Sequence, residues 1–294
     1  TTNLQRDNKY TYKMAWLEKP IKGLLLDISG VLKNGDLAIE GSVEAFRRLK
    51  ASKIPFRLCT NETQEPREAL RAKLSRLQFD VDLDKIFAPA PAMAARLRQE
   101  KRIPHLLIHP KINCEFDQPP NGVEPDCVVI GDACEAFTYE AMNTAFNILL
   151  KLKQKGEPKF YTLGRGKYYM EPNGLMLDLG PFTAALEYAS GLTAELIGKP
   201  SPRFFKSALD SLELPPDQVV MIGDDIVGDV GGAQGVGLRG VLVRTGKFQP
   251  SDENHEKVKP DAIVDNFSQA IDQILQKCCY SCKSQRFDDR VPKK

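Results

Sequence analysis

Four short polar stretches could carry chemistry, and each lies at or just after the end of an apolar run with the length of a strand. The polar residues are, in chain order, Asp27 with Ser29, Thr60 with Asn61, Lys199, and Asp224 with Asp229. Ligands of open α/β sheets bind outside the carboxyl ends of the strands, so we expect these stretches to meet there. Together they offer a carboxylate nucleophile, hydrogen-bond donors, a cation and further carboxylates. Transfer of a phosphoryl group to a carboxylate needs that set.

The carboxylates in this set indicate a metal cofactor. Asp27, Asp224 and Asp229 would repel any phosphate brought near them unless a cation offset their charge. Mg²⁺ is favoured because it accepts a few carboxylate or carbonyl ligands together with water and substrate oxygens. On its own, Asp27 could equally cap the turn that follows it, and only the other three stretches favour a catalytic role.

The elements that would position these residues alternate between strands and helices. Strands are predicted at 22–26, 56–61, 194–197, 219–222, 240–245 and 262–264, and helices from Ser42, over 64–77, around 205–212 and over 268–275. This order predicts an α/β fold whose core is a Rossmann-like, doubly wound parallel sheet. A hairpin turn is predicted at Asn34–Asp36, since Asn and Gly accept positive φ.

A second α/β unit interrupts this pattern. It occupies 89–195, with predicted strands at 106–108, 127–130, 160–163 and 175–177 and helices over 139–152 and 182–189. The core domain would then consist of 21–88 and 196–276. Residues 1–20 and 277–294 lack periodicity and are predicted to be N-terminal and C-terminal tails.

The composition is that of a globular protein in a reducing compartment. Of the 294 residues, 42% are hydrophobic and 27% charged, and the net charge is +2 with both signs mixed along the chain. No apolar run reaches the ~20 residues that span a bilayer, and no signal peptide is evident. We therefore expect a cytoplasmic location, with the nucleus as a second one, and neither nucleic acid nor membrane as partner. The C-terminal cysteines lack the second Cys or His pair of a zinc site.

The four stretches resemble the motifs of the haloacid dehalogenase-like phosphatase superfamily, over about residues 21–276. The resemblance implies that Asp27 is the nucleophile and forms an aspartyl-phosphate. It implies that Asp27, Asp224 and the main-chain carbonyl of Ser29 bind Mg²⁺, while Asp229 orients that shell. It further implies that the phosphoryl group is held by Asp27, Ile28, Ser29, Thr60, Asn61 and Lys199.

The same resemblance implies a role for the inserted unit. An insertion between Asn61 and Lys199 is typical of the large α/β cap domain, which closes over the active site, and the hairpin at Val31–Ile39 would be the flap. A homodimer is expected because caps of this kind often form dimers. Within the cap, Arg165, Lys167, Tyr168 and Tyr169 could contact substrate or simply end a solvated strand.

Longer stretches resemble one branch of the superfamily. They are 27–32, 198–202, 204–209, 223–234, 244–248 and 250–253. Members of this branch act on inorganic pyrophosphate, phosphohistidine and phospholysine. The resemblance implies small phosphorylated substrates, with phosphohistidine-bearing proteins as a further partner class. The tail from Cys278 onward does not take part in it.

Ser29 departs from the wider superfamily, most of which has an aspartate two residues after the nucleophile. That aspartate protonates the leaving oxygen, and a hydroxyl is a poor proton donor at pH 7. Phosphorus–nitrogen bonds and phosphoanhydrides need less of this help, so we expect Ser29 to favour them over alkyl esters. Two alternatives stay open: a phosphatase of a small phosphate ester, and a non-catalytic phosphate-binding regulator.

Overall fold

The computed structural model describes residues 15–118, 120, 122–171 and 174–288. Its contacts group the chain into two compact units. The first comprises the described residues of Thr1–Cys59, Lys73–Val81 and Phe205–Lys294, and the second comprises those of Thr60–Ala72 and Asp82–Phe204. The domain boundaries predicted at 88/89 and 195/196 stay a prediction.

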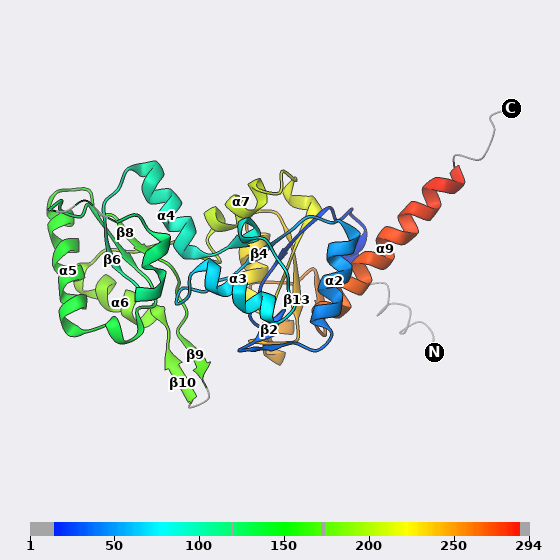
Figure 1. Ribbon diagram of the computed structural model, residues 1–294, viewed down its shortest axis with the longest axis horizontal. Coiled ribbons are helices and arrows are strands. Elements are labelled where there is room, and N and C mark those ends of the chain that lie inside the picture. Colours follow the sequence, from blue (N-terminus) through cyan, green and yellow to red (C-terminus); the bar gives the residue numbers. More distant parts are fainter. Residues whose placement is uncertain (1–14, 119, 121, 172–173, 289–294) are drawn as a thin grey trace. The chain divides into compact units, whose positions relative to one another are not determined.

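The first unit is built on a parallel sheet. Its strands lie in the order β14-β13-β12-β1-β4, and their bounds are Ala262–Val264, Arg239–Val243, Val219–Gly223, Gly23–Leu26 and Phe56–Cys59. In register, Leu26 of β1 lies between Ile222 of β12 and Leu58 of β4. The predicted parallel α/β sheet is confirmed, with helices beside it (Figure 1). The strand predicted for this sheet at 194–197 is an error of assignment, because it pairs instead with a strand of the second unit.

The strand order reverses direction between β1 and β12. From β1 the chain proceeds outward to β4, and from β12 it proceeds the other way to β13 and β14. Such a switch point leaves a crevice at the carboxyl ends of the two central strands, because their connections leave in opposite directions. Asp27 and Asp224 are the residues that immediately follow these two strands.

The sheet is fixed by complete burial of its central strands. All residues of β1, β12 and β13 are buried, as expected of a parallel sheet covered on both faces. Each leucine in β1 then contributes roughly 1.5–3 kcal/mol of transfer free energy. The helices of the first unit include α2 (Ser42–Ser52), which packs against α9 (Phe267–Asp288), and the short α8 (Gly232–Gln234). Helices α3 (Arg67–Arg76) and α7 (Pro202–Asp210) belong to both units.

The predicted hairpin after the first strand is confirmed. Strands β2 (Lys33–Asn34) and β3 (Leu37–Ala38) pair antiparallel across Gly35, whose φ is +55°. An ion pair of 2.7 Å joins Asp36 at the hairpin tip to Lys73 of α3. Lys73 lowers the pKa of Asp36 through this contact.

The second unit has a parallel sheet of its own. The order is β11-β8-β7-β6, with bounds Glu195–Leu196, Phe160–Thr162, Cys127–Ile130 and Pro104–Leu107. Helices α4 (Pro89–Glu100), α5 (Tyr139–Gln154) and α6 (Leu179–Ser190) supply apolar side chains to a core around these strands. The short strand β5 is Ile86–Phe87, and an antiparallel hairpin of β9 (Tyr168–Glu171) and β10 (Gly174–Leu177) extends away from the four-stranded sheet (Figure 1).

The N-terminal tail predicted at 1–20 is wrong for its last residues. A 3-10 turn spans Ala15–Leu17, and the side chains of Trp16 and Leu17 are buried. The guanidinium of Arg239 donates hydrogen bonds to the carbonyls of Trp16, Lys19 and Pro20. This segment was missed because it packs through two apolar side chains and one distant arginine, which leave no periodic pattern. Residues 1–14 lie outside the described part.

The C-terminal tail predicted from 277 is also wrong over much of its length, because α9 continues to Asp288. Gln276–Asp288 contains neither proline nor glycine, and Gln, Lys and Arg are good helix formers. A helix that is nucleated on a buried first half can continue without an apolar stripe, since propagation costs far less than nucleation. Residues 289–294 lie outside the described part.

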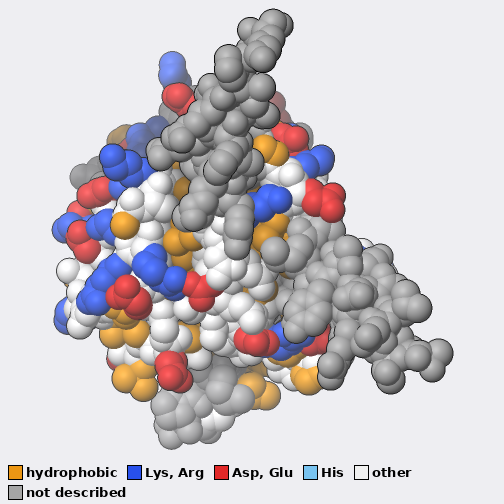
Figure 2. All heavy atoms as spheres, turned by 90° about the vertical axis from the view of Figure 1, so that its right-hand side faces the viewer, with side chains coloured by type: hydrophobic (Ala, Val, Ile, Leu, Met, Phe, Trp, Pro, Cys, Tyr) orange, Lys and Arg blue, Asp and Glu red, His pale blue; other side chains and the backbone are white. Residues whose placement is uncertain are grey.

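Within the described residues, no helix has both the length and the apolar character needed to cross a membrane. On the face drawn in Figure 2, Lys and Arg side chains are interspersed with Asp and Glu.

Candidate active site

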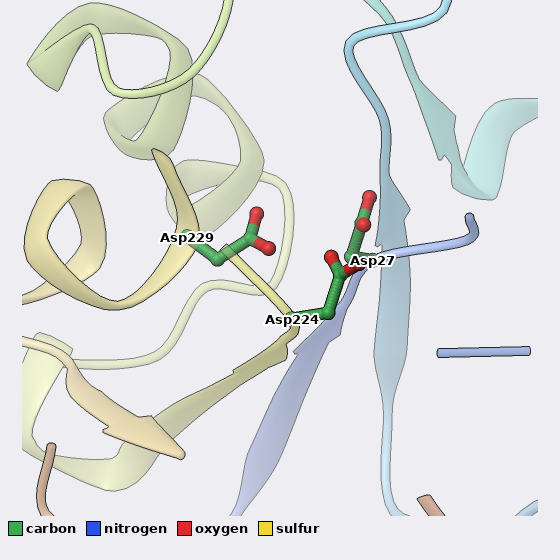
Figure 3. Close-up of side chains that lie close together, drawn as sticks. All are labelled: Asp27, Asp224 and Asp229. Carbon is green, nitrogen blue, oxygen red and sulfur yellow. The ribbon is translucent and has the colours of Figure 1, made fainter. Parts of the chain in front are cut away.

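Three aspartates meet at the switch point of the first unit. Asp27 follows β1, Asp224 follows β12, and Asp229 lies in the π-helical turn Ile226–Gly231 (Figure 3). One carboxylate oxygen of each lies within 4.8 Å of the others, and the three residues are only 7%, 2% and 1% exposed. Residues about 200 positions apart in the sequence thus form one buried acidic site.

The loop after β1 is tightly fixed by its own backbone. The N–H of Asp27 donates to the carbonyl of Ile222 at 2.9 Å, which extends the pairing of β1 with β12. The carbonyl of Ile28 then accepts hydrogen bonds from the N–H groups of Leu32 and Lys33, so the chain turns sharply beside the aspartate. Ile28 is fully buried, whereas Ser29 is exposed.

Asp224 is enclosed by backbone. Its Oδ2 atom accepts a hydrogen bond of 2.7 Å from the N–H of Lys247. A Cβ atom added to Gly30 or to Gly246 would lie 1.9 or 2.0 Å from the same oxygen, and both glycines have positive φ. Only glycine therefore fits at these two positions, because a side chain would displace the carboxylate.

Asp229 is held through Asp225. The N–H of Asp225 donates to Oδ2 of Asp229 at 3.1 Å. The side chain of Asp225 in turn accepts hydrogen bonds from the N–H groups of Val227 and Gly228, which caps the turn. Asp225 thus supports the cluster and is not a member of it.

The three carboxylates strongly perturb one another. Burial, followed by the negative charges of Asp27 and Asp229, raises the pKa of Asp224 to about 8. At neutral pH the site must therefore hold a proton or a cation, because three buried like charges are not tolerated without one. Grouped carboxylate oxygens suit a hard divalent cation, and Mg²⁺ fits this donor set.

The other predicted site residues lie in the second unit. Thr60 and Lys199 are buried, at 4% and 5% exposed. The amide side chain of Asn61 accepts from the N–H of Lys199 at 2.9 Å and donates to its carbonyl at 3.0 Å. The hydroxyl of Thr60 accepts from the N–H of Glu62 at 3.1 Å. The structure therefore joins Asn61 to Lys199, and the approach of both to the aspartates stays a prediction.

The candidate cap residues differ in what they contact. Arg165 forms a two-bond ion pair with Glu187 and also donates to the carbonyl of Ala194. Its guanidinium therefore binds other residues of the second unit. Tyr168 is 60% exposed on β9. A contact that the sequence did not indicate lies nearby: Gln64 donates to the buried carboxylate of Asp132 at 2.7 Å.

The loop after β13, for which no role was predicted, closes one side of the aspartate cluster. The hydroxyl of Thr245 donates to the carbonyl of Gly30, and Lys247 binds Asp224 through its backbone. A signal was available, because Thr245 ends a predicted strand and is followed by glycine and lysine. The backbone contacts themselves leave no trace in residue types.

Comparison with known proteins defines the class. A family model described as haloacid dehalogenase-like hydrolase matches residues 24–118, and one described as HAD-hydrolase-like matches residues 196–270. The 4-nitrophenylphosphatase of Thermotoga maritima has a similar structure, with a TM-score of 0.78 and 25% identity, covering 86% of this chain and 97% of that one. The chain belongs to the haloacid dehalogenase-like hydrolase family and has its α/β fold.

Two curated relatives indicate which branch of this family the chain resembles. The phospholysine phosphohistidine inorganic pyrophosphate phosphatase of Bos taurus is 52% identical over 89% of this chain and 98% of the relative. The protein of the same name from Homo sapiens is 53% identical over 87% of this chain and 95% of the relative. The resemblance stated from the sequence is confirmed, and the chain is a hydrolase of the haloacid dehalogenase type.

Proposed function

We propose that this chain is a Mg²⁺-dependent phosphatase that hydrolyses inorganic pyrophosphate and the phosphorus–nitrogen bonds of phosphohistidine and phospholysine. The main support is the buried cluster of Asp27, Asp224 and Asp229 at the switch point, whose grouped carboxylate oxygens suit a divalent cation. The names of relatives about half identical over most of the chain support the substrate class.

Asp27, Asp224 and the main-chain carbonyl of Ser29 would hold the ion, and Asp229 would orient them. Bound there, Mg²⁺ would supply positive charge against the anionic phosphate. Thr60 and Lys199, together with the backbone from Asp27 to Ser29, would hold the oxygens of the phosphoryl group. Asn61 would add its free amide hydrogen, since its other contacts fix the backbone of Lys199.

The chemistry assigned to Asp27 proceeds in two displacements. A carboxylate oxygen of Asp27 bonds to phosphorus while the bond from phosphorus to the bridging oxygen or nitrogen breaks, and the electron pair departs with the leaving group. A water oxygen then attacks phosphorus of the aspartyl-phosphate and loses a proton to solvent. Inorganic phosphate leaves, and the Asp27 carboxylate is restored.

Ser29 supports the choice of substrates. Its hydroxyl stands where a proton-donating carboxyl would be needed for a poor leaving group. An imidazole or amine nitrogen can leave with a proton taken from solvent, and phosphate leaves from pyrophosphate as a stabilised anion. The exposed side chain of Ser29 therefore limits alkyl esters more than these substrates.

The test compares rates on pyrophosphate, phosphohistidine, phospholysine and several phosphate esters, with Mg²⁺ present and after EDTA. We expect Asp27→Asn to reduce all turnover to background, because an amide oxygen is a poor nucleophile. Glu44→Gln is the matched control: it neutralises an exposed carboxylate of the same unit and should leave the rates unchanged. Turnover that survives Asp27→Asn or EDTA would overturn the mechanism. A preference for esters would instead support a phosphate ester as substrate, as in the name of the 4-nitrophenylphosphatase of Thermotoga maritima.

A further inference from the structure

The loop from Arg244 to Lys247 is anchored at its start and contacts the aspartate cluster at its end. The backbone N–H of Arg244 donates to the carbonyl of Val264 at 3.0 Å. Its guanidinium binds two carboxylates, at 2.7 Å for Glu253 and 2.8 Å for Asp265. The end of β13 is therefore a fixed base, and the next three residues extend from it toward Asp224.

Thr245 connects this loop to the loop of the nucleophile. Its hydroxyl donates to the carbonyl of Gly30, three residues after Asp27. A Cβ atom built on Gly246 would lie 2.5 Å from the Cα atom of Gly30, so the two backbones touch without side chains between them. The Thr245 hydrogen bond closes this contact from one side.

The contact between the two loops affects which oxygen of Asp224 is available to a cation. Oδ2 lies against Gly30 and Gly246 and accepts the N–H of Lys247. Oδ2 is thus crowded by two glycines and already has a donor, which favours Oδ1 as the oxygen that would face a cation. If the loops after β1 and β13 separated, Oδ2 would lose the N–H of Lys247 and its contacts with Gly30 and Gly246. Both oxygens of the Asp224 carboxylate could then contact the ion.

We propose that Thr245 is a positioning residue that keeps one oxygen of Asp224 away from the ion and thereby favours Mg²⁺ over Ca²⁺. This inference rests on the proposed function, in that it concerns the same cation. Mg²⁺ demands near-ideal octahedral geometry, whereas Ca²⁺ takes six to eight oxygens and often accepts both from one carboxylate. An Asp224 that presents one oxygen therefore suits the smaller ion.

The experiment measures ion affinity without substrate, from the rise in unfolding midpoint during separate titrations of metal-free protein with MgCl₂ and CaCl₂. Thr245→Val should weaken Mg²⁺ by about 10- to 100-fold, as loss of an outer support does at metal sites. Ca²⁺ should lose less, so that the ratio of the two affinities falls. Thr245→Ser keeps the hydroxyl and should restore the wild-type ratio.

Thr144→Val is the matched control, because it also removes a hydroxyl-to-carbonyl hydrogen bond, of 2.9 Å to Glu140, at an exposed position of α5 in the other unit. It should leave both affinities unchanged. An unchanged affinity ratio in Thr245→Val overturns the inference alone, whereas a wild type that binds neither ion overturns the proposed function as well. If Thr245→Val does not unfold cooperatively, Thr245→Ala replaces it. Failure of both to fold would make Thr245 a folding residue and overturn its assigned role.

Discussion

At the scale of single residues, the site depends on the position of each carboxylate. Asp27 and Asp224 supply two of the carboxylates. Gly30 and Gly246 leave space for the carboxylate of Asp224, and the backbone N–H of Lys247 fixes its orientation. Asn61 combines two roles: its predicted part as a phosphate donor stays a prediction, and its side chain also accepts from the N–H of Lys199 and donates to the carbonyl of Lys199. The residue types thus indicated which groups could react, and the contacts show which other residues hold those groups in place.

Ser29 provides the sharpest residue-scale prediction. Ser29→Asp places a carboxyl group on an exposed position two residues after the nucleophile, where it can donate a proton to a leaving oxygen. We expect kcat/KM for alkyl phosphate esters to rise relative to pyrophosphate, within the 10²- to 10⁴-fold typical of general acid catalysis. Ser29→Asn has nearly the same size and no acidic proton, so it is the control. Equal ratios in the two variants would contradict the role of Ser29.

At the scale of elements, buried strands were easy to predict and helix ends were not. Leu24–Leu26 and Val219–Ile222 are continuous apolar runs, which in a parallel sheet can only be interior strands. Helix α4 was not among the predicted helices. It begins with Pro89 and contains Pro91 in its first turn, where a helix accepts proline at no hydrogen-bond cost. The extension of α9 was missed because its second half lacks an apolar pattern.

The turn that carries Asp229 gives an element-scale prediction. Asp225 caps it through the N–H groups of Val227 and Gly228, at 3.0 and 2.7 Å. Asp225→Ala should lower the free energy of unfolding by about 1 kcal/mol, the usual cost of losing a cap. Asp225→Asn retains an acceptor oxygen and should lose much less. Urea unfolding of both variants distinguishes a capping role from a purely electrostatic one, which would make the two losses equal.

At the scale of the whole molecule, each unit has a parallel sheet and a core of its own. The first holds the aspartate cluster, and the second holds Thr60, Asn61 and Lys199. Each core collects apolar side chains from distant stretches of the chain. The free energy of unfolding can therefore depend on pH through titratable groups of the second unit as well as through the aspartates of the first.

His105 of β6 gives a prediction for stability against pH. Burial lowers the pKa of His105 below its ordinary value of 6.5. As the pH falls below 6.5 the unfolded chain takes up a proton before the folded one does, so the folded state loses stability until the lower pKa is passed. His105→Gln should unfold with a weaker dependence on pH between 6.5 and 5, measured by urea unfolding at each pH. Parallel curves for the two proteins would rule out a contribution from this histidine.

By itself the sequence determined the α/β class, the strand ends that carry Asp27 and Asp224, and the chemistry those residue types permit. These features depend on local hydrophobicity and on the reactivity of side chains, which neighbouring residues already specify. Only the tertiary structure decided that Asp229 joins the cluster within 4.8 Å, that Thr245 and Lys247 enclose it, and that Trp16 and Leu17 are buried. Such contacts join residues far apart in the chain through backbone atoms common to every residue, so no pattern of side chains records them.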